Sequence, residues 1–467
     1  MSDSLHTRLG QLRRQQQREP DNVAVLQQLA QALFQAGRKS ACLEALGDLY
    51  RRVGQDPDQV RQIGAFCLRA EYYPEAADYY RKCLELRPDD NQAHNDLATI
   101  LQKHGRFREA ERHFRAAIAP PDPVPGALLG LANSRKFSED DRDLVTRIAG
   151  TTHGNPMVGV CRDFALGKIY TDLKDYPAAF AAYASGNRTQ KKQLPAYPWP
   201  SLQNLVETAR SLTTRFGAVP KPATDRVRQP VFVVGMPRTG TTLLEQQLSD
   251  RFGLKALGER DLIQDCFRQL QSWQGQGETV TGAHLQRLQD GYLAAAGVPT
   301  AGGFVDKNPL NFLFAGIIRL IFPHALILHC RRDPFDTLLS NWFQLFGRPE
   351  LAYSFDLDDC ARFYRFYKGA MVDWQPLLAP PVLTVDYEDL VARTDEVLTA
   401  LPLRRLEADR EPETGAIHTA SLWQARQPVY RDSLQRWRRH KADLGDFIDR
   451  YHEEFYGQGG SGTGSTD

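Results

Sequence analysis

Residues 231–244 read Val-Phe-Val-Val-Gly-Met-Pro-Arg-Thr-Gly-Thr-Thr-Leu-Leu, and this stretch decides the fold. Its four leading apolar residues, mostly β-branched, predict a buried strand. A tight turn with two glycines and a proline follows, and Thr-Thr then opens a helical run. The backbone N–H groups of such a loop, together with the start of its helix, form an anion site. The stretch therefore predicts an α/β domain with a phosphate-binding loop.

The loop departs from the nucleotide-triphosphatase pattern at one position. The pattern G-x-x-x-x-G-K-[ST] requires a lysine where this chain has Thr241, and Arg238 lies inside the loop instead. The lysine that reaches a γ-phosphate is therefore missing. We expect the loop to bind a phosphorylated nucleotide whose γ-phosphoryl group is not transferred, which leaves a phosphate-loop kinase as a remote alternative.

Length and composition narrow the class of protein. A chain of 467 residues predicts two or three domains. Its 58 Lys plus Arg nearly balance 57 Asp plus Glu, which argues against a nucleic-acid or anionic-membrane partner. We expect no membrane span and, from the polar N-terminus, no signal peptide. Seven scattered cysteines without C-x-x-C spacing predict reduced thiols in a cytoplasmic protein, with no zinc site.

The first 120 residues repeat with a period of 34. Three of the aligned columns hold Leu29, Ile63 and Leu97, then Ala30, Gly64 and Ala98, then Leu46, Tyr80 and Phe114. Small residues recur where two helices must approach closely, and a fourth unit is predicted at about 163–183. The pattern resembles the tetratricopeptide repeat, a helix–turn–helix unit, although an ordinary helical bundle is an alternative. Such repeats stack into a solenoid whose concave face suits a protein or peptide partner.

After the repeats, the sequence pattern changes from helices alone to strands that alternate with helices. Runs at 231–234, 303–305, 325–330 and 382–385 predict strands that alternate with helices, as in a doubly wound parallel sheet. The predicted fold is an α/β P-loop-like domain, a parallel sheet flanked by helices, preceded by an all-α tetratricopeptide-repeat solenoid. The predicted divisions are a solenoid at 1–195, a linker at 196–228, the α/β domain at 229–456 and a flexible tail at 457–467.

A second anion site follows the predicted strand at 325–330. Arg331 and Arg332 come at the strand end, and Ser340 lies eight residues further on in a helix. Arg331 is the more readily explained by pairing with nearby aspartates. Open α/β sheets bind ligands at the carboxyl ends of their strands, so both anion sites should face one crevice. Two phosphate sites on one crevice suit a nucleotide phosphorylated at both ends of its ribose.

Together, these two segments resemble the cofactor-binding segments of sulfotransferases, which use 3′-phosphoadenosine 5′-phosphosulfate (PAPS) as sulfuryl donor. The resemblance implies that the first segment holds the 5′-phosphosulfate and that Arg332 and Ser340 hold the 3′-phosphate. The implied residues of the first segment are Arg238, Thr239, Gly240, Thr241 and Thr242.

Further islands are similar to those of tyrosylprotein sulfotransferases. They are Gly258-Glu259, Asp306-Lys307-Asn308-Pro309, Tyr387, and Ser421 followed by Pro428-Val and Arg436-Trp437. The resemblance implies that Glu259 is the catalytic base, that Lys307, Arg238 and Ser421 stabilise the leaving group, and that Tyr387 and Arg436 contact the cofactor. Thr239, Asn308 and Arg436 depart from the family's commonest residues, and the role of Asn308 is not assigned by the pattern.

The resemblance implies a metal-free, PAPS-dependent sulfotransferase acting on an acceptor hydroxyl. A protein or peptide tyrosine, docked by the repeats, is the leading acceptor, and a carbohydrate or small-molecule hydroxyl is the nearest competitor. A different class is also open: a repeat scaffold that carries a degenerate nucleotide-binding domain. Taken singly, Glu259 also fits a solvated or capping role, Lys307 a helix-start charge, and Ser421 a turn or cap.

Overall fold

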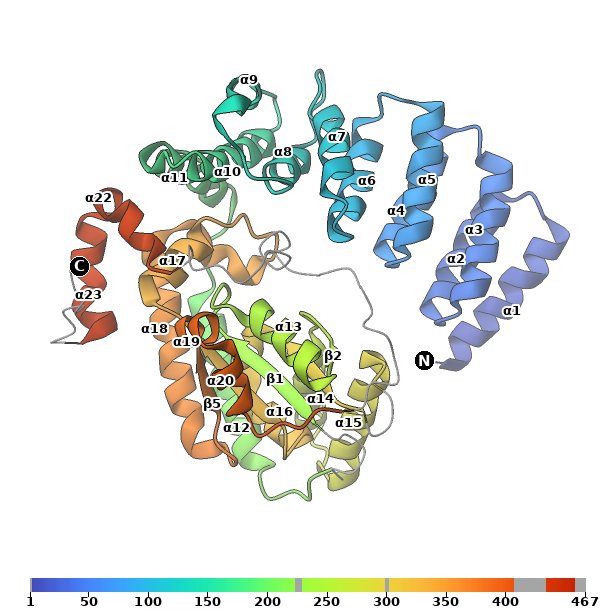
Figure 1. The fold of residues 1–467 in the computed structure, drawn as a ribbon. Helices are drawn as coiled ribbons and strands as arrows, with labels where there is room; N and C mark the ends of the chain where they lie inside the picture. The colour runs from blue at the N-terminus through green and yellow to red at the C-terminus, as the bar shows by residue number, and fades with distance from the viewer. Residues whose placement is uncertain (1, 223–228, 299–301, 407–433, 458–467) are drawn as a thin grey trace. The chain divides into compact units, whose positions relative to one another are not determined.

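The computed structural model describes residues 2–222, 229–298, 302–406 and 434–457. The chain divides into two compact units that interleave in sequence. One comprises Met1–Phe137 and Thr146–Ala165, and the other Ser138–Val145 and Leu166–Asp467. The described elements of the first unit are helices, whereas the second contains a five-stranded sheet with helices around it (Figure 1).

Helices of the first unit pack in consecutive pairs. α2 packs with α3, α4 with α5, and α6 with α7, as the blue part of Figure 1 shows. Helices α9 (Arg142–Ala149) and α10 (Pro156–Asp172) cross the boundary between the units. The remaining helices are α1 (Ser2–Arg18), α2 (Val23–Gln35), α3 (Lys39–Val53), α4 (Pro57–Arg69), α5 (Tyr73–Leu86), α6 (Asn91–Lys103), α7 (Phe107–Ala117) and α8 (Pro125–Ala132).

The 34-residue period has a direct structural cause. A Cβ atom on Gly64 would lie 3.1 Å from the ring of Tyr80, so the small residue lets the two helices of a pair approach. The turns between paired helices also repeat, because Gly37, Glu71 and Gly105 all adopt positive φ, at 67°, 60° and 77°. The predicted helix–turn–helix repeat is therefore confirmed.

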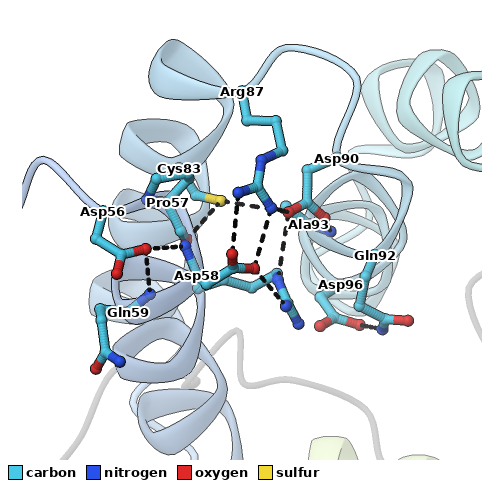
Figure 2. A network of polar contacts seen from close by, with 11 residues as sticks. Asp56, Pro57, Asp58, Gln59, Cys83, Arg87, Asp90, Gln92, Ala93 and Asp96 are labelled. Atoms are coloured by element: carbon cyan, nitrogen blue, oxygen red, sulfur yellow. Dashed lines mark hydrogen bonds and ion pairs between the residues drawn. The ribbon is translucent and has the colours of Figure 1, made fainter.

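A charged network joins α4, α5 and α6 near the start of α6 (Figure 2). The Arg87 guanidinium donates to both carboxylate oxygens of Asp58, each at 3.0 Å. Arg61 lies 3.3 Å from Asp90, whose other oxygen caps α6 by accepting from the Ala93 N–H at 2.9 Å. These contacts link adjacent repeats through charged side chains.

The second unit is built on a parallel sheet with strand order β2-β3-β1-β4-β5. Its strands are β1 (Pro230–Gly235), β2 (Lys255–Ala256), β3 (Phe304–Lys307), β4 (Leu326–Arg331) and β5 (Leu383–Asp386). Four of the five coincide with predicted strands. β2 was not predicted, because two residues are too short to give a hydrophobic run. The predicted parallel sheet flanked by helices is confirmed.

Alternating side chains of β1 explain why both faces of the sheet are covered. Val231 and Val233 share one core cluster with Leu244 and Leu248 of α13, and β5, α19 and α20 complete this cluster. Phe232 points to the opposite face, where its ring contacts Tyr292 of α15. Because successive side chains of a strand face opposite ways, a wholly apolar strand needs such a cover on each side.

The helices of the second unit surround this sheet. Beyond α9 and α10 they are α11 (Tyr176–Gln193), α12 (Trp199–Arg215), α13 (Thr241–Phe252), α14 (Leu262–Gly275), α15 (Gly282–Ala296), α16 (Ala315–Ile321), α17 (Pro334–Trp342), α18 (Leu357–Trp374), α19 (Tyr387–Ala392), α20 (Thr394–Thr399), α22 (Lys441–Leu444) and α23 (Asp446–Tyr456). Short 3₁₀ segments are η1 (Glu139–Asp141), η2 (Pro309–Phe314), η3 (Pro349–Phe355), η4 (Gln375–Leu377) and η6 (Arg436–His440).

Two helices upstream of β1 belong to the sheet-containing unit. α12 occupies about half of the stretch for which the sequence suggested a linker, and it packs on η2 and α16. The contact is close, since a Cβ on Gly316 would lie 2.3 Å from the Thr213 hydroxyl oxygen. α11 is joined to α17 by the Asn187 amide, which donates to the Trp342 carbonyl at 2.9 Å.

All seven cysteines are free and buried. Within the described ranges, no helix combines the length and the apolar character that crossing a membrane requires.

Candidate active site

Among the described residues, the predicted site residues at the ends of β1, β3 and β4 lie at the carboxyl edge of the sheet. Lys307, at the end of β3, pairs in register with Val233 of the central strand β1. On the other side of β1, Gly235 pairs with Cys330 near the end of β4. Adjacent strands lie about 4.8 Å apart, so the loops after β3, β1 and β4 begin within about 10 Å of one another.

The phosphate loop runs from β1 to α13 with an unusual backbone. Arg238 adopts φ +72°, rare for a residue other than glycine, and Gly240 adopts φ +95° as the N-cap of α13. The hydroxyl of Thr239 donates to the Met236 carbonyl at 2.8 Å, so this side chain holds the loop together. Thr241 and Thr242 are the first residues of α13, where helix N–H groups favour an anion.

Arg238 joins the two predicted anion segments. Its Nε donates to the Ser340 hydroxyl on α17 at 3.1 Å. Arg332 donates to the Arg238 carbonyl at 3.3 Å, and the Asn341 amide donates to the Pro237 carbonyl at 2.8 Å. The loop after β1 and the segment after β4 are thus one connected structure.

Arg332 is buried beside an acid and an aromatic ring. Its guanidinium lies 3.5 Å from the Asp336 carboxylate and 4.8 Å from the ring centre of Tyr387. Burial raises the pKa of Asp336 to about 6, although Arg332 acts in the opposite direction. Tyr387 also packs on the phosphate loop, since a Cβ on Gly240 would lie 2.2 Å from its ring. The predicted cofactor-side Tyr387 is therefore next to both anion segments.

Arg331 differs from its neighbour. It is exposed and forms a two-pronged ion pair with Asp386, with distances of 2.8 and 2.9 Å. Its partner is on β5, whereas the sequence pointed to pairing with acids on the following helix. Arg332, not Arg331, faces the loop.

Glu259 and Lys307 form a direct ion pair. Lys307 is fully buried, and its Nζ lies 2.6 Å from Glu259 Oε1, while the glutamate side chain remains 32% exposed. The two residues are 48 positions apart in sequence. β3 supplies the lysine, and the turn after β2 supplies the glutamate. The Glu259 carboxylate is thus held by a buried ammonium group and remains partly accessible to solvent.

Asn308, to which the pattern gave no role, orients this turn. Its amide donates to the Arg260 carbonyl at 3.1 Å and to Asp261 at 3.3 Å. Its side-chain oxygen caps the start of η2 by accepting from the Leu310 N–H at 3.2 Å. Asn308 thus links the residues after Glu259 to the residues after Lys307.

Sequence reasoning assigned no role to two buried carboxylates near Lys307. Glu245 of α13 accepts from the Gly258 N–H at 2.8 Å, and burial raises its pKa. Asp306 accepts from the Tyr292 hydroxyl at 2.5 Å and from the Asn311 amide at 3.1 Å. Burial raises the pKa of Asp306 to about 7, against the opposing effect of the Tyr292 hydrogen bond. An acidic residue within a helix or strand pattern carries no sequence signal of such burial.

The predicted residues near the C-terminus have different outcomes. Arg436 starts η6, with its guanidinium 5.1 Å from the ring centre of Phe343. The N–H of Trp437 donates to Asp336 at 2.9 Å, which connects this segment to the acid beside Arg332. Ser421 and the Pro428-Val pair lie outside the described residues.

Two family models match parts of the chain. Residues 230–409 match the family model described as "Sulfotransferase family", and residues 61–93 match the tetratricopeptide repeat. Residues 230–409 of this chain are therefore similar to sulfotransferases, and residues 61–93 are similar to tetratricopeptide repeats. The family generally uses PAPS. Among the described residues, no group of three or more His, Cys, Asp or Glu has a geometry that could hold a metal ion.

One relative and two solved structures are similar to parts of the chain. An uncharacterized protein of Aquifex aeolicus (strain VF5) is 25% identical over 407 residues, which is 82% of this chain and 53% of that protein. The chain therefore spans about half the length of that relative.

The sulfotransferase domain of the Synechococcus PCC 7002 olefin synthase is 21% identical, with a TM-score of 0.32, covering 47% of this chain and 90% of that one. A Mycobacterium tuberculosis H37Rv sulfotransferase is 15% identical, with a TM-score of 0.23, covering 56% and 82%.

Proposed function

We propose that this protein transfers a sulfuryl group from PAPS to an acceptor hydroxyl, with Glu259 as the base. The observation that carries the proposal is the 2.6 Å contact between Glu259 and the buried Lys307 beside the phosphate loop. Sulfuryl transfer needs a base for the acceptor hydroxyl and a cation for the departing phosphate. Glu259 and Lys307 would supply these two groups next to the anion-binding loop. In a kinase, metal ions and a loop lysine would supply the positive charge instead.

The donor would be held by both anion segments. The loop N–H groups, Thr241, Thr242 and Arg238 suit the 5′-phosphosulfate. Arg332 and Ser340 suit the 3′-phosphate, with Tyr387 beside them. The Arg238–Ser340 hydrogen bond of 3.1 Å keeps the two segments in contact, as one nucleotide bound to both would require. Arg436 and Ser421 remain proposed cofactor-side residues.

The proposed chemistry follows from the positions of the charges. The acceptor oxygen forms a bond to sulfur as the bond from sulfur to the 5′-phosphate oxygen breaks. Glu259, partly exposed, would accept the proton of the acceptor hydroxyl. Lys307, Arg238 and Ser421 would stabilise the negative charge that develops on the departing phosphate. The products are a sulfate ester and 3′-phosphoadenosine 5′-phosphate (PAP).

Titration with PAP tests the donor. We expect calorimetry to show binding that does not require Mg²⁺ and that exceeds the binding of ATP. Arg332→Ala should weaken it at least about 30-fold, since it removes a buried charge from a phosphate site. Arg331→Ala is the matched control, because that exposed arginine pairs with Asp386, and it should change the affinity less than about threefold. Preference for Mg·ATP, or no effect of Arg332→Ala, would overturn the proposal.

A protein or peptide tyrosine is the acceptor we propose. Its support is the set of motifs around Glu259, Lys307 and Arg436, together with repeats of the kind that bind polypeptides. The test is transfer of ³⁵S from labelled PAPS to tyrosine peptides, with matched phenylalanine peptides as controls. Label on sugars or small phenols but not on tyrosine peptides would contradict the tyrosine assignment and retain the sulfotransferase activity. If Glu259→Gln transfers label at the parent rate, the assigned base is wrong.

A further inference from the structure

Glu245 is a charged residue type at a buried position next to the apolar core. It lies one turn into α13, the helix that starts at the phosphate loop, and its side chain is 7% exposed. Its helix neighbours Leu244 and Leu248 are in the apolar core. A carboxylate buried on such a face costs free energy unless hydrogen bonds and opposite charge offset the loss of water.

The hydrogen bond comes from the turn that carries Glu259, and the opposite charge comes from Lys307 at the end of β3. Glu245 Oε1 accepts the Gly258 N–H at 2.8 Å, and Gly258 immediately precedes Glu259. Gly258 adopts φ +66°, the left-handed conformation that lets the turn present this N–H to α13. Lys307 attracts the Glu245 carboxylate, while Glu259 repels it. Two glutamates from different elements therefore act on one buried lysine.

We infer that Glu245 is a positioning residue that ties the Glu259 turn to the phosphate-loop helix. The inference rests on the proposed function, because it assumes that a phosphate binds at the start of α13. A phosphate that fixes the first turn of α13 also fixes Glu245, which lies on the next turn. Glu245 in turn holds the backbone of Gly258 and so the direction in which Glu259 leaves the turn. Donor binding and alignment of the base are thereby coupled through one hydrogen bond.

Two substitutions separate this role from packing. Glu245→Met fills a similar volume without an acceptor, and methionine is well tolerated in cores and helices. Glu245→Gln keeps an oxygen that can accept the Gly258 N–H. Asp250→Ala, which removes an exposed carboxylate from the same helix, is the control. The measurement is hydrogen exchange of the amides at 257–261 in the full chain, with and without PAP, alongside the affinity for PAP.

In the parent protein and in Asp250→Ala, we expect PAP to slow exchange in this segment. Glu245→Met should exchange at least about tenfold faster there, lose the slowing by PAP, and keep its PAP affinity within about threefold. Glu245→Gln should restore both the slow exchange and the PAP response. Exchange in Glu245→Met equal to that of the parent, or Met and Gln variants that behave alike, would overturn the inference. Failure of the parent to bind PAP would instead overturn the proposed function.

Discussion

Lys307 is fully buried at the end of β3, an interior strand of the sheet. Three carboxylates interact with its ammonium group. Glu259 contacts it directly, and Glu245 and Asp306 interact with it from α13 and from the same strand. If all three acids were ionised, the cluster would be negative at the place where we propose that an anionic donor binds. Burial raises the pKa values of Glu245 and Asp306, which favours their neutral forms and relieves this conflict.

Asp306 should make stability depend on pH. Its pKa is about 7 in the folded chain and near 4 in the unfolded chain, so the folded state holds the proton between these values. Its contribution to stability is full below about pH 4 and is lost progressively as the pH rises to about 7. Asp306→Asn removes this dependence. Relative to the parent, the variant should gain up to about 1.4 kcal/mol per pH unit between pH 5 and 7.

Scanning calorimetry of parent and Asp306→Asn at pH 5, 6, 7 and 8 measures the difference in Tm. The difference should grow toward pH 7 and then level off. The exposed Asp250→Asn is the control and should show no such trend. A constant difference between parent and Asp306→Asn would mean that Asp306 is ionised throughout the range.

Gly240 is the residue of the phosphate loop that should tolerate a side chain least. It combines φ +95° with the ring of Tyr387, 2.2 Å from the position of a Cβ. Gly240→Ala should therefore cost at least about 1–2 kcal/mol in backbone strain alone and displace Tyr387 from Arg332. We expect a lower Tm and at least about tenfold weaker PAP binding. Gly275→Ala, at an open position at the end of α14, should lower neither quantity. Equal losses for the two substitutions would show that strain at Gly240 and its contact with Tyr387 do not limit PAP binding.

At the scale of elements, α11 supports the helix that carries Ser340. Asn187 is buried, and its amide donates to the Trp342 carbonyl in the last turn of α17, where helix carbonyls lack partners within the helix. Asn187→Ala leaves that carbonyl unpaired, at a cost of about 1–3 kcal/mol. The Tm of the sheet-containing unit should fall by roughly 2–4 °C for each kcal/mol lost.

Arg188→Ala is the matched control for this prediction, since Arg188 is an exposed neighbour on the same helix. Its Tm should stay within about 1 °C of the parent value, because isolated surface substitutions have small effects. An Asn187→Ala protein as stable as Arg188→Ala would show that α11 does not support α17.

The elements that sequence predicted are those with a local signal. The apolar run at 231–234 and the run before Arg332 are recognisable as strands from their apolar residues. The parallel sheet follows from the alternation of strands with helices. The positions of Lys307 and Arg332 then follow from strand ends. Glu245 could not be found this way, because a glutamate in a helix has the same pattern whether it faces solvent or a backbone N–H 13 residues away.

α12 illustrates a second kind of miss. The proline-rich composition around α12 suggested a linker. Pro200, however, lies in the first turn of the helix, where proline is favoured. Its apolar residues have no visible partners in the local sequence, because they pack on η2 and α16, about 100 residues downstream. Long-range packing of this kind leaves no mark on spacing or periodicity.

At the scale of the whole molecule, the sheet-containing unit does not begin where the sulfotransferase-family match begins. The match starts at residue 230, but the compact unit includes Leu166–Asp467 and a short earlier segment. α12 buries Trp199, Val206 and Leu212. Burial of such side chains contributes about 1.5–3 kcal/mol each, a sum comparable to the 5–15 kcal/mol that holds a typical domain together.

We therefore expect the fragment 229–467 to fail to fold and the fragment 154–467, which keeps α10 to α12 intact, to unfold cooperatively and to bind PAP. The comparison uses circular dichroism melting and PAP titration, with the full chain as reference. The longer fragment should retain the PAP affinity of the full chain within about threefold, because the proposed donor contacts all come from residues 236–436. A fragment 229–467 with the same Tm and PAP affinity as 154–467 would show that α11 and α12 contribute neither to stability nor to donor binding. Weak PAP binding by a folded 154–467 fragment would mean instead that the removed repeats contribute to the donor site.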